Sequence, residues 1–218
     1  MSKTAELVVV EEAAPQYWEQ ACAELMKHDR ILKKLIPKHG SVFLRTRGDA
    51  FTTLARSIVG QQISVAAAQS VWNKTLLAAK NKVNPKNILA LSVEELRAAG
   101  LSGRKVEYIR DLAEHFNSGR LHANQWKGME DEAIIKELCE IRGIGRWTAE
   151  MFLIFNMVRP NILPLDDAGL IKAISLNYFS GEPVSRHEAR EVAANWAPWR
   201  TVATWYMWRS LDPIAVEY

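Results

Sequence analysis

The sequence has few cysteines, a small net charge and no long apolar run. Its two cysteines, Cys22 and Cys139, lie far apart among 218 residues, which argues against a disulfide framework or a cysteine-ligated cluster. No apolar stretch is long enough to span a membrane, and the N-terminal "MSKTAELVVVEEAAP" lacks the features of a secretory signal. The net charge of +3 excludes a uniformly basic coat protein but permits a local basic cleft. An intracellular protein is expected.

Alternating strand patterns are also scarce, with "AELVVVEE" and "SVFLRTR" as the two weak candidates. Ser92 and Glu95 form a capping-box pattern for one helix, and Gly100 suits its C-terminal cap. The sequence therefore predicts an all-α fold of about ten helices. Amphipathic patterns typical of helices cover Tyr17–Ile36, Ala50–Ile58, Val65–Ala79, Lys105–Phe116, Asp131–Ile141, Ala168–Tyr178, Val184–Trp196 and Thr201–Leu211.

The segment "CEIRGIGRWTAEMF" is helical in pattern except at Gly143 and Gly145. Glycines permit a sharp bend and close approach by another backbone. A second helix is expected from Arg146 to about Val158, with its free N–H groups at the bend and Thr148 in its first turn. This helix–hairpin–helix pattern predicts a site that binds DNA phosphate whatever the base sequence. A plain turn between two helices with a glycine cap is the alternative.

The following segment, "RPNILPLDDAGLIKAI", contains two adjacent aspartates. Eight residues with two prolines, Arg159–Asp166, favour an extended path that can return alongside the preceding helix. Asp166 or Asp167 would then begin the next helix, close to the bend. An N-cap role is common for aspartate, so one of the pair is expected to cap and the other to face a cleft. A carboxylate there could stabilise positive charge on a reacting sugar.

Tryptophan is unusually frequent, with eight in the chain. Trp147 and Met151 are one turn apart and share a helix face. Most of these rings are expected in the core, yet the surplus suggests stacking against an extruded base, with indole faces favouring a cationic one. Four of the eight lie in the last stretch, at Trp196, Trp199, Trp205 and Trp208.

Five motifs occur in the order found in the helix–hairpin–helix DNA glycosylases. The chain resembles, more narrowly, the 3-methyladenine DNA glycosylase II family of alkylbase glycosylases, in a compact form without an extra N-terminal β domain. The resemblance covers about residues 51–208. The motifs are "ARSIVGQQISVAAAQSVW", "GLSGRKVEYI", "GIGRWTAEMFLI", "LPLDDAGLIKAI" and "WAPWRTVATWYMW".

The resemblance implies a role for each matching residue. Asp167 corresponds to the catalytic aspartate, and Asp166 to a structural neighbour. Gly143, Gly145 and Thr148 correspond to the hairpin that grips DNA phosphate, with Ile144 among the carbonyls that hold Na⁺ or K⁺ in relatives. The remaining matches are Trp147, Trp208 and Met151 in the base pocket, Gln62 as the wedge that fills the gap in the stack, and Lys105 and Arg104 as further DNA contacts.

The resemblance also implies the chemistry. Relatives that cut the backbone carry a lysine where Trp147 stands, so a monofunctional hydrolase is expected, acting on alkylated purines in double-stranded DNA. No cofactor is needed for that reaction, and a monomer is expected. One glycosylase unit over 1–218 would comprise a central helical subdomain at about 46–160 and a second at about 1–45 plus 161–218, with the active cleft between them.

Three other functions remain open from the sequence. They are a bifunctional glycosylase and lyase for oxidised bases, a non-catalytic helix–hairpin–helix DNA-binding protein, and a helical structural protein unrelated to nucleic acid. The preferred lesion is also open among 3-methyladenine, 7-methylguanine, ethenoadenine and hypoxanthine. A bacterial nucleoid and a nucleus are not distinguished.

Overall fold

A computed structural model describes residues 14–40, 43–46 and 48–211. Within those residues the chain forms twelve α-helices and two short 3₁₀-helices and contains no strand, so the predicted all-α class is confirmed. Residues 43–46 of the weak strand candidate "SVFLRTR" have no regular secondary structure, whereas "AELVVVEE" lies outside the described residues. No helix in this part of the chain combines the length and apolarity that crossing a membrane requires.

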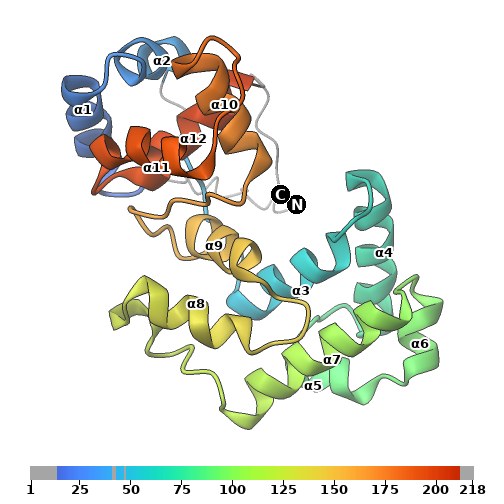
Figure 1. The fold of residues 1–218 in the computed structure, drawn as a ribbon. Helices are drawn as coiled ribbons and strands as arrows, with labels where there is room; N and C mark the ends of the chain where they lie inside the picture. Colours follow the sequence, from blue (N-terminus) through green and yellow to red (C-terminus); the bar gives the residue numbers. More distant parts are fainter. Residues whose placement is uncertain (1–13, 41–42, 47, 212–218) are drawn as a thin grey trace, which may run out of the picture.

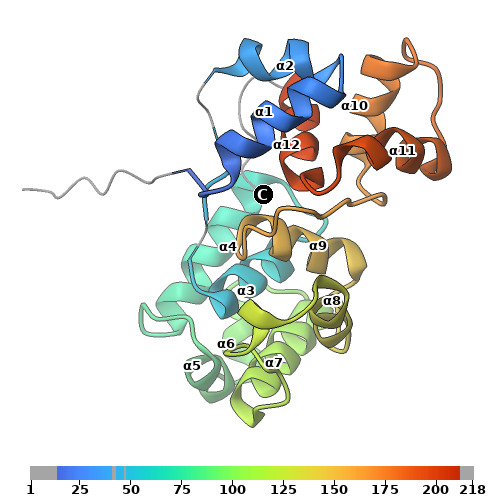
Figure 2. The ribbon, with the colours of Figure 1, turned by 90° about the vertical axis from the view of Figure 1, so that its left-hand side faces the viewer.

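The helices pack in two groups, which the two ribbon views separate clearly (Figure 1, Figure 2). The first group contains α3 (Ala50–Gly60), α4 (Val65–Ala78), α5 (Pro85–Ala90), α6 (Val93–Ala98), α7 (Gly103–Ser118), the 3₁₀-helix η1 (Trp126–Gly128), α8 (Asp131–Cys139) and α9 (Arg146–Phe155). The second contains α1 (Trp18–His28), α2 (Leu32–His39), α10 (Ala168–Tyr178), α11 (Arg186–Val192), η2 (Ala193–Trp196) and α12 (Arg200–Leu211).

The helix count exceeds the prediction partly because one expected helix, Tyr17–Ile36, is broken at Asp29. The Asp29 carboxylate accepts two backbone N–H groups at the start of α2, at 2.8 and 2.9 Å. It also accepts the Tyr178 hydroxyl at 2.7 Å and the Trp196 indole N–H at 3.1 Å. A buried carboxylate must be satisfied by such donors, so Asp29 ends α1 and joins α2 to α10 and η2.

Helix α9 lies at the centre of the molecule, packed against α8 and α3 (Figure 1). Every residue from Thr148 to Phe155 is buried, so this helix has no fully exposed face after its first two residues. It ends at Phe155, one turn before the predicted Val158, and Val158 has a φ of 52° that no helix continues. The capping box of Ser92 and Glu95 at the start of α6 is confirmed.

Candidate active site

The Asp167 side chain lies between two tryptophans. The indole N–H of Trp147 donates to Oδ2 at 3.0 Å, and the indole N–H of Trp208 donates to Oδ1 at 2.8 Å. The backbone N–H of Leu170 also donates to Oδ1, at 2.7 Å. Asp167 is 5% exposed. These three N–H donors suit a carboxylate, and they bring residues from α9, α10 and α12 to one point.

We expected one aspartate of the pair to cap the helix and the other to face the site. In the structure, Asp167 does both. Asp167 is the N-cap of α10 and also the residue held by the two indoles. Asp166 is exposed and forms an ion pair with Arg186 at 2.7 Å. One carboxylate has two oxygens with several lone pairs, so it can serve the helix and the site together.

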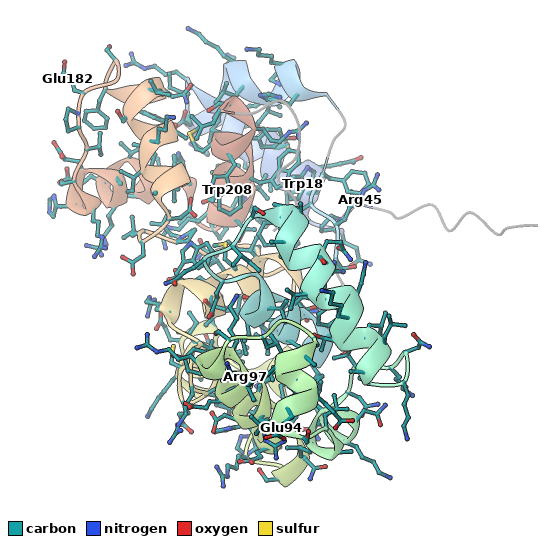
Figure 3. The ribbon with its side chains drawn as sticks, turned by 90° about the vertical axis from the view of Figure 1, so that its right-hand side faces the viewer. Trp18, Arg45, Glu94, Arg97, Glu182 and Trp208 are labelled. Atoms are coloured by element: carbon teal, nitrogen blue, oxygen red, sulfur yellow. The ribbon has the colours of Figure 1, made fainter. Side chains whose placement is uncertain are left out.

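Trp208 is fixed from two further sides. Its ring stacks on Phe155, with centroids 5.8 Å apart and an interplanar angle of 11°. A Cβ atom on Gly169 would lie 3.1 Å from Oδ1 of Asp167 and 3.4 Å from Cδ1 of Trp208, so glycine allows this close approach. Figure 3 shows Trp208 on the side of its helix group that faces the other group. Sequence analysis missed both Phe155 and Gly169; the glycine directly after "DDA" was the available signal.

The bend before α9 requires glycine at one position. Gly143 has a φ of 81°, and a Cβ atom there would overlap the ring of Tyr108 on α7. Gly145 is the N-cap of α9, which begins at Arg146 as predicted. The first N–H groups of a helix have no intrahelical acceptor, so this bend presents them, and the positive end of the helix dipole, two residues before Trp147.

A cluster of charged side chains joins α8 and α9, the two helices on either side of the bend. Arg146 donates to both carboxylate oxygens of Glu132 on α8 and, through Nε at 2.9 Å, to Glu150 on α9. Glu150 is 4% exposed, and burial raises the pKa of its carboxyl group to about 7. The Arg146 side chain therefore links α8 to α9 and is already engaged in these contacts. In the sequence, the only sign of this role for Glu150 is its position four residues after Arg146.

The remaining predicted contacts differ in exposure. Gln62 is exposed in the turn between α3 and α4, with a φ of 57°. The Lys105 ammonium group donates to the carbonyl of Val59 at 2.7 Å, and burial lowers its pKa. Arg104 is exposed beside it. Thr148, Met151 and the side chain of Ile144 are buried, so their contacts with a nucleotide or a cation stay predictions.

Comparisons with known proteins agree on one family. Residues 55–198 match the HhH-GPD superfamily of base excision DNA repair proteins. A DNA-3-methyladenine glycosylase of Bacillus subtilis is 31% identical over 201 residues, which are 86% of this chain and 66% of that protein. DNA-3-methyladenine glycosylase 1 of Schizosaccharomyces pombe is 28% identical over 182 residues, 82% of this chain and 80% of the relative.

Solved structures extend the likeness to three dimensions. A DNA-3-methyladenine glycosidase from Bacillus halodurans superposes with a TM-score of 0.84 at 35% identity, covering 88% of this chain and 89% of the other. The S. pombe 3-methyladenine DNA glycosylase bound to abasic DNA gives a TM-score of 0.78 at 27% identity, covering 90% of this chain and 98% of the other. The chain therefore belongs to the HhH-GPD superfamily of base excision DNA repair proteins, among the 3-methyladenine DNA glycosylases.

Proposed function

We propose that this protein is a DNA glycosylase that hydrolyses the N-glycosidic bond of alkylated purines in duplex DNA, the first step of base excision repair. One observation carries the proposal: the Asp167 carboxylate is held between two indoles, next to the helix that follows the glycine bend. A carboxylate, aromatic rings and a phosphate-binding helix terminus are the groups that such a reaction requires.

Asp167 stabilises the sugar as the base departs. Breaking the N-glycosidic bond leaves positive charge on the deoxyribose, and a nearby carboxylate in a water-poor site lowers that barrier. Asp167 also orients the attacking water. Because the side chain is nearly closed from solvent by Trp147 and Trp208, entry of a nucleotide requires at least one indole to release its hydrogen bond.

The surrounding residues bind the DNA and the extruded base. The bend at Gly143 and Gly145, with Thr148, grips a phosphate through backbone N–H groups, so the grip does not depend on sequence. The base stacks against Trp147 and Trp208, and an alkylated ring nitrogen makes it cationic, which favours an indole face and an easy departure. Gln62 fills the gap left in the duplex, Met151 borders the base pocket, and Lys105 and Arg104 add contacts to the strand.

Water, and no amino group of the protein, is the nucleophile. Trp147 occupies the position at which lyases of the superfamily carry lysine, so no Schiff base with the sugar forms. Borohydride reduction during turnover on DNA containing an oxidised base tests this. No covalent protein–DNA product is expected, whereas a trapped product would reveal an amine nucleophile elsewhere in the protein and a lyase.

The decisive experiment compares wild-type protein with Asp167→Asn. Methylated duplex DNA carrying labelled methyl groups is incubated with each, and released bases are separated and counted. We expect release by the wild type and its loss by about a thousandfold or more in the variant. Affinity for undamaged duplex is expected to stay within about twofold, since phosphate contacts supply it. Release retained by the variant would remove Asp167 from the chemistry; no release by the wild type would contradict the function.

Three further features belong to this proposal. The helices divide functionally at about residues 46 and 160, so that nucleotide and carboxylate meet between two subdomains. The protein acts as a monomer without a cofactor for the chemistry. Hairpin carbonyls, Ile144 among them, hold Na⁺ or K⁺, because hard cations of this kind prefer oxygen ligands. A potassium-dependent rise in melting temperature, absent with choline, tests the last point.

A further inference from the structure

Gln61 joins two parts of the chain that the proposed function uses separately. Its side-chain Nε2 donates to the carbonyl oxygen of Gly143 at 2.8 Å, across 82 positions of sequence. The acceptor belongs to the peptide between Gly143 and Ile144, at the start of the bend. Because Gly143 also packs against the Tyr108 ring, the Gln61 amide and that ring together fix the orientation of this peptide.

Gln61 is also the residue directly before Gln62. The turn between α3 and α4 begins at Gln61, which is the C-cap of α3, and Gln62 adopts a φ of 57°, a conformation that glutamine rarely takes. Such a conformation persists only where neighbouring contacts determine it. Two side-chain donors hold the chain before it: Gln61 binds the bend, and Lys105 binds the carbonyl of Val59 on the last turn of α3.

Two exposed apolar side chains follow Gln62 at the tip of this turn, on either side of Ser64. Ile63 is 40% exposed and Val65, the first residue of α4, is 74% exposed, although both are large hydrophobic side chains. A tip of this kind suits contact with the stacked faces of bases, but only if the backbone carrying it is held at a fixed place relative to the gripped phosphate. The bond from Gln61 supplies that fixed relation.

We infer that Gln61 is a positioning residue that couples the phosphate grip of the 143–145 bend to the base-displacing turn at residues 62–65. The inference rests on the proposed function, which names the bend as the phosphate grip and that turn as the element that enters the duplex. Loss of the amide donor leaves the carbonyl of Gly143 without this partner and frees the turn from the bend. The two DNA contacts then form independently, so the affinity for a duplex in which a base is already missing falls toward the affinity for undamaged duplex.

A glutamine away from the proposed DNA contacts offers a matched control. Gln61→Met and Gln20→Met keep side-chain length, and each removes one amide donor: that of Gln61 to the carbonyl of Gly143, and that of Gln20 to Glu24 on the surface of α1. Each full-length variant is measured for melting temperature, for affinity to a duplex with a tetrahydrofuran abasic analogue and to the same duplex undamaged, and for single-turnover release of methylated bases. The ratio of the two affinities is the readout, because a general loss of stability lowers both.

Gln61→Met is expected to lower the ratio of abasic to undamaged affinity about tenfold, because the free energy of one hydrogen bond corresponds to a change of about that size. Single-turnover release should slow in proportion. Its affinity for undamaged duplex stays within about twofold, and Gln20→Met leaves the preference within about twofold, because its amide lies on α1, away from the proposed DNA contacts. An unchanged preference in Gln61→Met, or an equal loss on both duplexes, would overturn the inference. If wild-type protein releases no base yet prefers the abasic duplex, and Gln61→Met loses that preference, the proposed chemistry fails and the coupling stands.

A second pair keeps the test decisive if Gln61→Met does not fold. Gln61→Glu places a carboxylate against the carbonyl of Gly143, and only its protonated form can donate to that oxygen. Its abasic preference is expected to recover as the pH falls, relative to Gln62→Glu, which brings the same charge to the neighbouring position. Parallel pH profiles for the two variants would attribute the effect to charge repulsion with DNA and would contradict the coupling.

Discussion

Two carboxylates are buried in the fold, Asp167 at the start of α10 and Glu150 within α9, and their hydrogen-bond donors differ in charge. Asp167, in the region of the two tryptophans, accepts hydrogen bonds from neutral N–H donors. Glu150, in the region where α8 and α9 meet, pairs with the guanidinium of Arg146, and burial nevertheless raises its pKa to about 7. The two side chains are 5% and 4% exposed, so burial alone does not distinguish a chemical role from a structural one.

The difference lies in what each carboxylate can still do. The donors of Asp167 among the described residues are neutral, so a positive charge that develops nearby meets a carboxylate with no cationic partner in this part of the chain. Glu150 already contacts the guanidinium of Arg146, which it shares with Glu132, and these contacts hold α8 and α9 together at the bend. Four substitutions test this contrast, beginning with the largest expected effect.

Removing each charge in turn separates the two roles most strongly. Asp167→Asn is expected to lower single-turnover base release by about a thousandfold or more, whereas Glu150→Gln lowers it by less than about threefold. Release of labelled purines from methylated duplex measures both. A loss of similar size in the two variants would mean that the contacts between α8 and α9 take part in the chemistry and would end the contrast.

Trp208→Ala removes one donor to Asp167 together with the ring stacked on Phe155. Stacking of a base on an aromatic side chain contributes about 1–3 kcal/mol, so excision of a cationic base should fall by about ten- to a hundredfold. Binding to undamaged duplex, measured in parallel by fluorescence anisotropy, should change far less. Equal losses in excision and binding would contradict a stacking role.

Glu150→Gln is expected to change the pH dependence of stability. Since the folded-state pKa is raised to about 7, the folded protein retains a proton that the unfolded chain loses near its ordinary value. The associated stability is present at low pH and is lost as the pH rises through about 7. Between pH 5 and pH 8.5 the wild type should therefore lose up to about 3 kcal/mol relative to the variant, seen in urea unfolding curves. Parallel curves would exclude titration of Glu150.

Asp166→Asn should have the smallest effect. The carboxylate is exposed, and its ion pair with Arg186 at the surface contributes less than about 1 kcal/mol. Melting temperature and base release are both expected to stay close to wild type. A severe loss of release in Asp166→Asn, with Asp167→Asn mild, would reverse the assignment within the pair.

Local sequence patterns predicted the elements that depend on local interactions. The bend at Gly143 and Gly145, the start of α9 at Arg146 and the capping box at Ser92 all follow from backbone requirements that particular residue types meet. The return of the chain to bring an aspartate beside the bend was also predictable, because the proline-containing segment limits its path.

Features that depend on distant partners were not predictable. The break at Asp29 exists because donors from α10 and η2 converge on it, and the sequence around it continues an amphipathic pattern. The contact between Gln61 and Gly143 joins residues 82 positions apart with no shared motif. The double role of Asp167 depends on two indoles that only the folded chain brings together.

The contact between Gly143 and Tyr108 has a consequence for how relatives can diverge. The aromatic ring occupies the volume that any side chain at position 143 would need. A substitution there becomes tolerable only after the residue at position 108 has shrunk, and even then the left-handed backbone penalises it. Across an alignment, the two columns should therefore vary together: lineages that abandon the glycine should already carry a small residue opposite.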